Sequence, residues 1–119
     1  MSNGIMFHHF HGGKFPKVQG SIDKKKFLKI INYLKKNKKI VTPQEFLNLI
    51  KKKEIIGNEV CLTFDDGIKS QKELILPILD KLNIKAFFFI YTSMLKGKSD
   101  NLEYFRDFRY LFYKKINFF

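Results

Sequence analysis

The sequence predicts an α/β fold built on parallel strands. Short apolar runs alternate with longer segments whose apolar residues recur at helical spacing, a pattern typical of strands joined by helices. With 45% hydrophobic, 16% aromatic and 29% charged residues, the composition is that of a chain that folds around a core. The 119 residues leave room for one small domain, whereas a closed (β/α) barrel needs ~200 residues or more. A barrel of that kind could not close in a chain of this length.

The N-terminal segment predicts a strand followed by a helix. The strand is expected over residues 4–10, and a glycine-containing loop follows it. Ser21 is expected to cap the helix, which should end near Asn37. Its apolar face has the spacing i, i+3, i+4 and i+7 and consists of Phe27, Ile30, Ile31 and Leu34.

A brief strand at residues 40–41 and a second helix come next. Thr42 is expected to cap this helix, with Pro43 at its first position and Glu45 at its third, the pattern of a capping box. Gly57 and Asn58 end it before the following strand. Its predicted inner side is formed by Phe46, Leu47, Leu49 and Ile50.

The second half of the chain repeats the alternation. Residues 59–64 predict a strand, and residues 70–82 predict a helix that Pro77 could kink. Residues 86–91 are apolar enough for a strand buried on both faces. A last helix is expected over residues 102–115. The predicted buried positions are Leu74, Ile75, Ile78 and Leu79 in the earlier helix and Tyr104, Phe105, Phe108, Leu111 and Phe112 in the last one.

Two adjacent carboxylates, Asp65 and Asp66, stand where the strand gives way to Gly67. A carboxylate beside buried apolar residues costs several kcal/mol unless it is paired, hydrogen-bonded or metal-bound. Asp66 could bind a divalent cation while Asp65 takes a proton from water. An isolated Asp-Asp-Gly is more often a polar turn. The strand before it and the amphipathic helix after it favour a functional site.

The segment Leu62-Thr63-Phe64-Asp65-Asp66-Gly67 resembles the first motif of the polysaccharide deacetylases, the nodulation-type deacetylase homology domain. Similar segments flank it on both sides, at residues 6–10 and at residues 84–90, where Phe87 replaces the commoner Thr. The resemblance covers most of residues 3–92 and implies a partial (β/α) barrel of the glycoside hydrolase and deacetylase type, its N-terminal half.

The resemblance implies a metal-dependent hydrolase that removes acetyl groups from an N-acetylated carbohydrate. In that family the first acid of the motif is the catalytic base, here Asp65, and the second is a metal ligand, here Asp66. The ion would be divalent, with zinc favoured. The family takes two further ligands from a His-(Ser/Thr)-x-x-His motif, and it takes an orienting Arg and a general-acid His from later motifs. This chain contains none of these motifs.

The missing motifs and the short length together predict a single incomplete domain over residues 1–119. The segment 102–119 is rich in aromatic residues and ends on Phe118-Phe119. Exposed apolar patches invite association, so domains rarely end in this way. We expect a truncated reading frame, whose product could be inactive by itself. The alternative is that this segment packs on a partner or on a membrane surface.

The charge balance raises a different class of function. A net charge of +12 and the many lysines could serve a basic, noncatalytic module that binds nucleic acid or an anionic membrane. The lysines are spread along predicted helix faces, and the only arginines are Arg106 and Arg109. Nucleic acid is therefore an improbable partner, because bidentate recognition draws on arginine. A weaker alternative is a phosphoryl-transfer enzyme with Asp65 as nucleophile.

The remaining singled-out residues are the one cysteine and the three histidines. Cys61 can form no intrachain disulfide, and we expect it to be a buried, inert thiol. No signal peptide or transmembrane stretch is visible, so we expect a cytoplasmic protein. His8, His9 and His11 could ligate zinc if Asp66 lay beside the first strand. We favour instead one histidine at the mouth of the site and the others on a loop or the surface.

Overall fold

The computed structural model describes residues 3–54, 57–92 and 96–97. The elements within these ranges are β1 (Gly4–Phe7), α1 (Lys24–Asn37), β2 (Lys39–Ile40), α2 (Pro43–Lys51), β3 (Glu59–Asp66), the π-helical turn η1 (Gln71–Ile75), α3 (Leu76–Lys81) and β4 (Phe87–Ile90). The predicted helix over residues 102–115 and the aromatic segment 102–119 lie outside the described residues.

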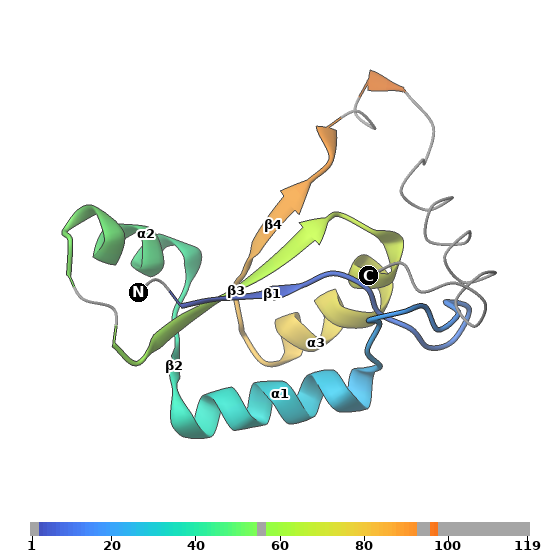
Figure 1. Cartoon of the computed structure of the whole chain (residues 1–119), viewed down its shortest axis with the longest axis horizontal. Helices are drawn as coiled ribbons and strands as arrows, with labels where there is room; N and C mark the ends of the chain where they lie inside the picture. Colours follow the sequence, from blue (N-terminus) through green and yellow to red (C-terminus); the bar gives the residue numbers. More distant parts are fainter. Residues whose placement is uncertain (1–2, 55–56, 93–95, 98–119) are drawn as a thin grey trace.

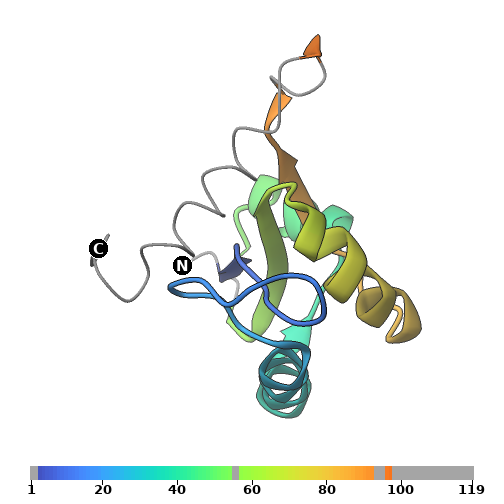
Figure 2. The same cartoon turned by 90° about the vertical axis from the view of Figure 1, so that its right-hand side faces the viewer.

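The sheet is parallel and centred on β3, as the alternating sequence predicts. β1 runs along one edge of β3. On the other edge, β2 pairs with the first residues of β3 and β4 pairs with its last residues. These two strands therefore follow each other along β3 (Figure 1). Because all pairs are parallel, β1 and β3 end on the same side of the molecule. Figure 2 views the molecule from that side, with the loop that follows β1 in front.

Alternate residues of β3 enter two separate cores. Val60, Leu62 and Phe64 pack with residues of α1, η1 and α3 in the larger core. Cys61 points to the opposite face and packs with Val41 and Phe46 in the smaller one. A strand sends successive side chains to opposite faces, and on the second face of β3 the buried residue is Cys61, between Glu59 and Thr63. The apolar run of β3 is thus explained by burial on two sides.

Three phenylalanines in register form a row of rings across the sheet. Phe64 of β3 stands opposite Phe7 of β1 and Phe88 of β4. Its ring is stacked on both neighbours, with centroids 5.3 Å from Phe7 and 4.9 Å from Phe88. Phe10 and Phe27 meet each other edge to face beneath this row. Phe64 is completely buried and is the centre of the larger core.

α1 begins and packs almost as the sequence predicts. Phe27, Ile31 and Leu34 are buried, and the helix ends at Asn37. The predicted cap, Ser21, is wrong. Asp23 caps the helix by accepting a hydrogen bond from the Lys26 amide. The Ser21 hydroxyl instead donates to the Val18 carbonyl and accepts from the Val18 amide, which closes the preceding loop.

α2 has the predicted beginning but a narrower inner side. The capping box between Thr42 and Glu45 is present, with Pro43 at the start. Phe46 is buried, whereas Leu47 is 40% exposed and Ile50 is 46% exposed. The predicted burial of Leu47 and Ile50 is wrong. The helix is short and covers only the region around Val41 and Cys61.

The predicted helix over residues 70–82 consists of two parts. In η1 the Leu76 amide donates to the Gln71 carbonyl, five residues back. α3 follows, with Pro77 in its first turn. Proline is tolerated in a first turn because the amide hydrogen it lacks has no partner there. The predicted single helix is thus interrupted by a π-helical turn just before Pro77.

β4 is not buried on both faces, so this prediction is wrong. Phe89 is 55% exposed and Ile90 is 60% exposed. Among the residues that the structure describes, β4 pairs only with β3. Side chains of a strand are buried only where other elements pack on the faces of the sheet, so an apolar sequence does not by itself ensure burial.

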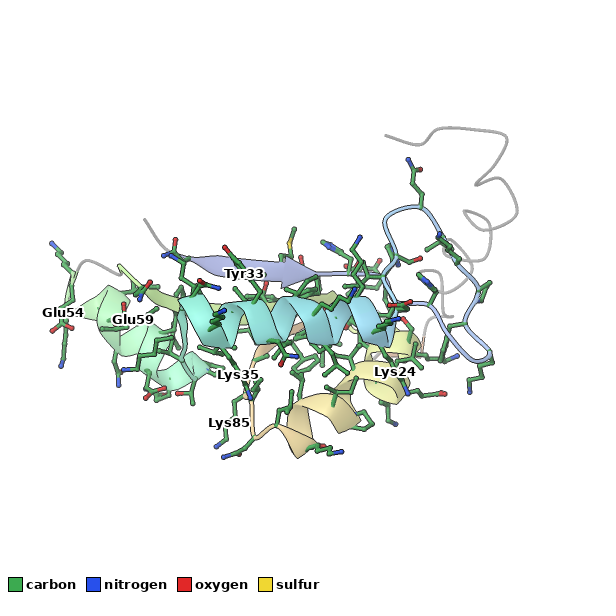
Figure 3. All side chains as sticks on the ribbon, turned by 90° about the horizontal axis from the view of Figure 1, so that it is seen from below. Lys24, Tyr33, Lys35, Glu54, Glu59 and Lys85 are labelled. Atoms are coloured by element: carbon green, nitrogen blue, oxygen red, sulfur yellow. The ribbon has the colours of Figure 1, made fainter. Side chains whose placement is uncertain are left out.

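The lysines cover solvated helix faces, as predicted. Every lysine of α1 and α2 is exposed. Figure 3 shows Lys24 and Lys35 near opposite ends of α1, with Tyr33 on the outer side of the same helix. No helix in the described part of the chain is long and apolar enough to cross a membrane.

Candidate active site

The acidic pair forms the last two positions of β3. The strand was predicted to end at Phe64, but it continues because Asp65 pairs with Phe89 and Asp66 pairs with Ile90. Both carboxylates are partly buried at the C-terminal end of the central strand. Catalytic groups of barrel enzymes lie at this end of the strands. The acidic pair therefore lies where catalytic groups are found in such enzymes. This position alone assigns no role to either acid.

Asp65 lies beside a histidine from the neighbouring strand end. The pairing of Phe7 with Phe64 brings the next residues, His8 and Asp65, side by side. The Nε2 atom of His8 is 3.4 Å from Oδ2 of Asp65, and the two side chains are 37% and 27% exposed. The imidazole and the carboxylate are thus close enough to interact and open enough to meet a ligand.

Asp66 has a backbone conformation that side chains rarely adopt. Its φ is +76°, and Gly67 follows with φ of +65°. Non-glycine residues avoid this region, although Asp enters it more readily than most. Gly67 fits closely, since a Cβ there would lie 3.4 Å from the Ile90 side chain. The chain therefore holds Asp66 in a strained turn, a feature common at functional sites.

The strain at Asp66 predicts an unusual order of variant stabilities. Asp66→Asn keeps the size of the side chain and its tolerance of a positive φ, so its free energy of unfolding should stay close to that of the wild type. Asp66→Ala should be less stable by about 1 kcal/mol. Asp66→Gly should exceed Asp66→Ala in stability. Urea denaturation followed by far-UV circular dichroism measures the order. An alanine variant more stable than the glycine variant would contradict it.

Gln71 is a site residue that no sequence pattern singles out. Its side chain is only 1% exposed. Its Nε2 donates to the backbone carbonyl of Asp65 at 2.6 Å and to that of His8 at 2.8 Å. In the sequence it is one polar position of a predicted helix. Only the three-dimensional structure reveals that its partners lie six and sixty-three residues away.

An apolar hollow lies beside the turn that follows the acidic pair. Its volume is about 230 Å³. The residues that line it come from the turn after β3, from η1 and α3, and from β4: Gly67, Ile68, Gln71, Lys72, Leu76, Phe88 and Ile90. Asp65 and Asp66 are not among these lining residues, and Gly67 is the lining residue next to them in the chain.

The three histidines follow β1 and do not form a common ligand set. β1 ends at Phe7, so all three histidines lie beyond the strand. His8 approaches Asp65, whereas the Nδ1 atom of His11 is 2.8 Å from the Ser21 hydroxyl. The interpretation with one histidine at the site and the others in the loop agrees with this arrangement. Asp65, and not Asp66, is the acid beside the end of the first strand.

The described residues offer only part of a metal site. Among residues 3–54, 57–92 and 96–97, no three His, Cys, Asp or Glu side chains are close enough together to hold an ion. Asp66 supplies a carboxylate, the kind of ligand that zinc accepts. Cys61 is not a candidate ligand or nucleophile here, because it is buried and burial raises the pKa of its thiol.

Comparisons with known proteins give one match to a family model and similar folds among solved structures. Residues 52–108 match the model of the family described as polysaccharide deacetylase. The fold is similar to a de-N-acetylase from Aggregatibacter actinomycetemcomitans, with a TM-score of 0.67 and 22% identity. It is also similar to the deacetylase PplD of Streptococcus pyogenes, a structure with acetate, with a TM-score of 0.64 and 20% identity.

The chain aligns with only part of each of these structures. The alignments cover 82% of this chain and 40% of the first structure, and 83% of this chain and 46% of the second. A comparison with curated protein sequences gives no match.

Proposed function

Because this chain carries part of a polysaccharide deacetylase domain, we propose that it is a hydrolase that removes acetyl groups from an N-acetylated carbohydrate. The observation that supports this most is the separation of the two neighbouring acids. Asp65 faces His8, and Asp66 is turned into a strained backbone conformation beside it. We further propose that the parallel sheet is the N-terminal half of a (β/α) barrel, with the acidic pair at the catalytic end of its strands.

In the proposed reaction, Asp65 is the general base. Its carboxylate accepts a proton from water as the water oxygen bonds to the acetyl carbonyl carbon. The bond between that carbon and the sugar nitrogen then breaks, acetate leaves, and the nitrogen takes a proton to give the amine. The imidazole of His8 keeps the carboxylate in place from one side. We propose no described residue as the proton donor for the amine.

We also propose that the enzyme depends on a divalent metal ion, with Asp66 as one ligand. A bound ion of this kind polarises a carbonyl group and lowers the pKa of bound water. The carboxylate of Asp66 fits this task, whereas a complete ligand set requires groups beyond the described residues. The cytoplasmic location stays a prediction.

Removing metal should abolish the proposed activity. Acetate release from an N-acetylated oligosaccharide is measured with the full-length homologous reading frame and with the 119-residue chain, before and after treatment with a chelator. We expect the rate to fall at least ~10-fold on chelation and to return when zinc is added back, because a coordinated ion stabilises the charge that develops on the carbonyl oxygen. Acetate release that a chelator leaves unchanged would contradict the metal dependence.

The same preparations distinguish between a hydrolase and a basic binding module. A module would bind nucleic acid or anionic vesicles with an affinity that falls steeply with salt. Asp66→Ala would leave that binding intact. Salt-sensitive binding without any acetate release would therefore favour the module over the hydrolase.

A further inference from the structure

The buried amide of Gln71 joins the ends of β1 and β3. Its nitrogen donates to the carbonyl oxygens of His8 and Asp65 at 2.8 Å and 2.6 Å. Carbonyl oxygens only accept hydrogen bonds, so the amide must present its nitrogen to both of them. One side-chain group therefore connects the backbones of the two residues whose side chains meet at the candidate site.

Strand pairing does not already provide this connection. The ladder between β1 and β3 ends with the pair Phe7 and Phe64. His8 and Asp65 are the residues that follow this pair in the two backbone segments, and β1 does not continue to His8. Gln71 bonds to the carbonyl groups just past the last pair. It extends the connection between the two backbone segments by one residue pair, at the place where the candidate site begins.

Stability alone is a poor explanation for Gln71. Its Oε1 atom is buried and has no hydrogen-bond partner among the described residues. A buried acceptor without a partner is destabilising, and an apolar side chain of similar size would avoid that cost. The neighbouring core positions of η1, Leu74 and Ile75, are apolar. The amide is therefore best explained by the two hydrogen bonds that its nitrogen donates.

We propose that Gln71 is a positioning residue, which fixes the distance between the His8 imidazole and the Asp65 carboxylate by bridging their backbone carbonyls. The proposal rests on the proposed function, in which Asp65 is the base. Gln71 reaches no substrate atom in this role. It acts through the two strand ends, and its loss would let the His8 loop move away from Asp65 while the rest of the sheet remains.

Nuclear magnetic resonance on the isotopically labelled 119-residue chain tests the bridge directly. In the wild type we expect scalar couplings through the hydrogen bonds, from the Gln71 side-chain nitrogen to the carbonyl carbons of His8 and Asp65. We also expect a nuclear Overhauser effect between the His8 ring and the Asp65 β protons. Absence of both couplings in the folded chain would overturn the proposal.

Variants then test positioning as distinct from folding. Gln71→Met keeps the length of the side chain and removes its amide, and we expect loss of the His8–Asp65 Overhauser effect. The matched control is Ile75→Val, which removes a buried methyl group from the same turn and should retain the effect. If Gln71→Met does not fold, Gln71→Asn serves instead, since its amide is too short to reach both carbonyls. An effect retained in either folded variant would overturn the proposal.

These measurements need no substrate. A failure of the proposed deacetylation would appear in the acetate assay and would leave the couplings and the Overhauser effect unchanged. A failure of the positioning role would appear in the spectra of the Gln71 variants, whatever the assay gives.

Discussion

Asp65→Asn is expected to lower the rate of acetate release by about 10²–10⁴-fold, the usual contribution of a positioned acid or base. The amide has the shape of the carboxylate but cannot accept the proton from water. The change should leave the fold intact, because the Asp65 side chain is partly exposed and the hydrogen bond from Gln71 is to its backbone carbonyl. The measurement is the initial rate of acetate release, with far-UV circular dichroism to verify the fold.

A matched control for this variant is Asp80→Asn. Asp80 is an exposed acid of α3, and the same change of charge there should leave the rate unaltered. If Asp65→Asn releases acetate as fast as the wild type, Asp65 is not the base. If both variants are slower to the same degree, the effect comes from the net charge and not from the site.

Phe64→Ala should cause the largest loss of stability. Phe64 is fully buried, and its ring stacks on Phe7 and Phe88. Truncating a buried phenylalanine costs about 3–5 kcal/mol, because apolar burial is lost and a cavity remains. Small domains have total stabilities of only ~5–15 kcal/mol. We expect the urea midpoint of the variant to fall sharply, or the cooperative transition to disappear.

Two further substitutions show whether this loss is specific to the core. Phe64→Leu keeps part of the buried volume and should be destabilised less than Phe64→Ala. Tyr33→Ala removes an aromatic ring that is 65% exposed, and its stability should change by no more than ~0.5 kcal/mol. Far-UV circular dichroism is the appropriate signal, because the chain contains no tryptophan. Equal losses for Phe64→Ala and Tyr33→Ala would contradict the central role of the ring row.

Local sequence signals predict the elements well where the deciding contacts are local. The capping box of α2 depends on residues three apart, and the apolar face of α1 depends on residues within three turns. Both could be predicted. The cap of α1 could not, because Ser21 and Asp23 are equally suitable and the loop hydrogen bonds of Ser21 decide between them. The exposure of β4 depends on which strands pair with it, which its own apolar residues do not report.

The candidate site divides in the same way. Asp65 and Asp66 could be selected because a strand, two acids and a glycine stand together in the sequence. The role of His8 depends on the register between β1 and β3, a contact across more than fifty residues. Gln71 depends on the same register and on the rotation of η1. Neither contact leaves a local pattern. The assignment of base and ligand roles to the two acids remains a prediction.

The three consecutive phenylalanines of β4 have a consequence for how that strand finds its alignment. A shift by two residues in one direction would put Phe89 in the place of Phe87 and Tyr91 in the place of Phe89, so that this face keeps aromatic side chains. On the other face the same shift would replace the stacked Phe88 with Ile90. The face that carries Phe88 therefore contributes most to distinguishing the correct alignment from this competitor. Phe88→Ile should therefore let β4 populate shifted alignments, and with them move the residues opposite Asp65 and Asp66.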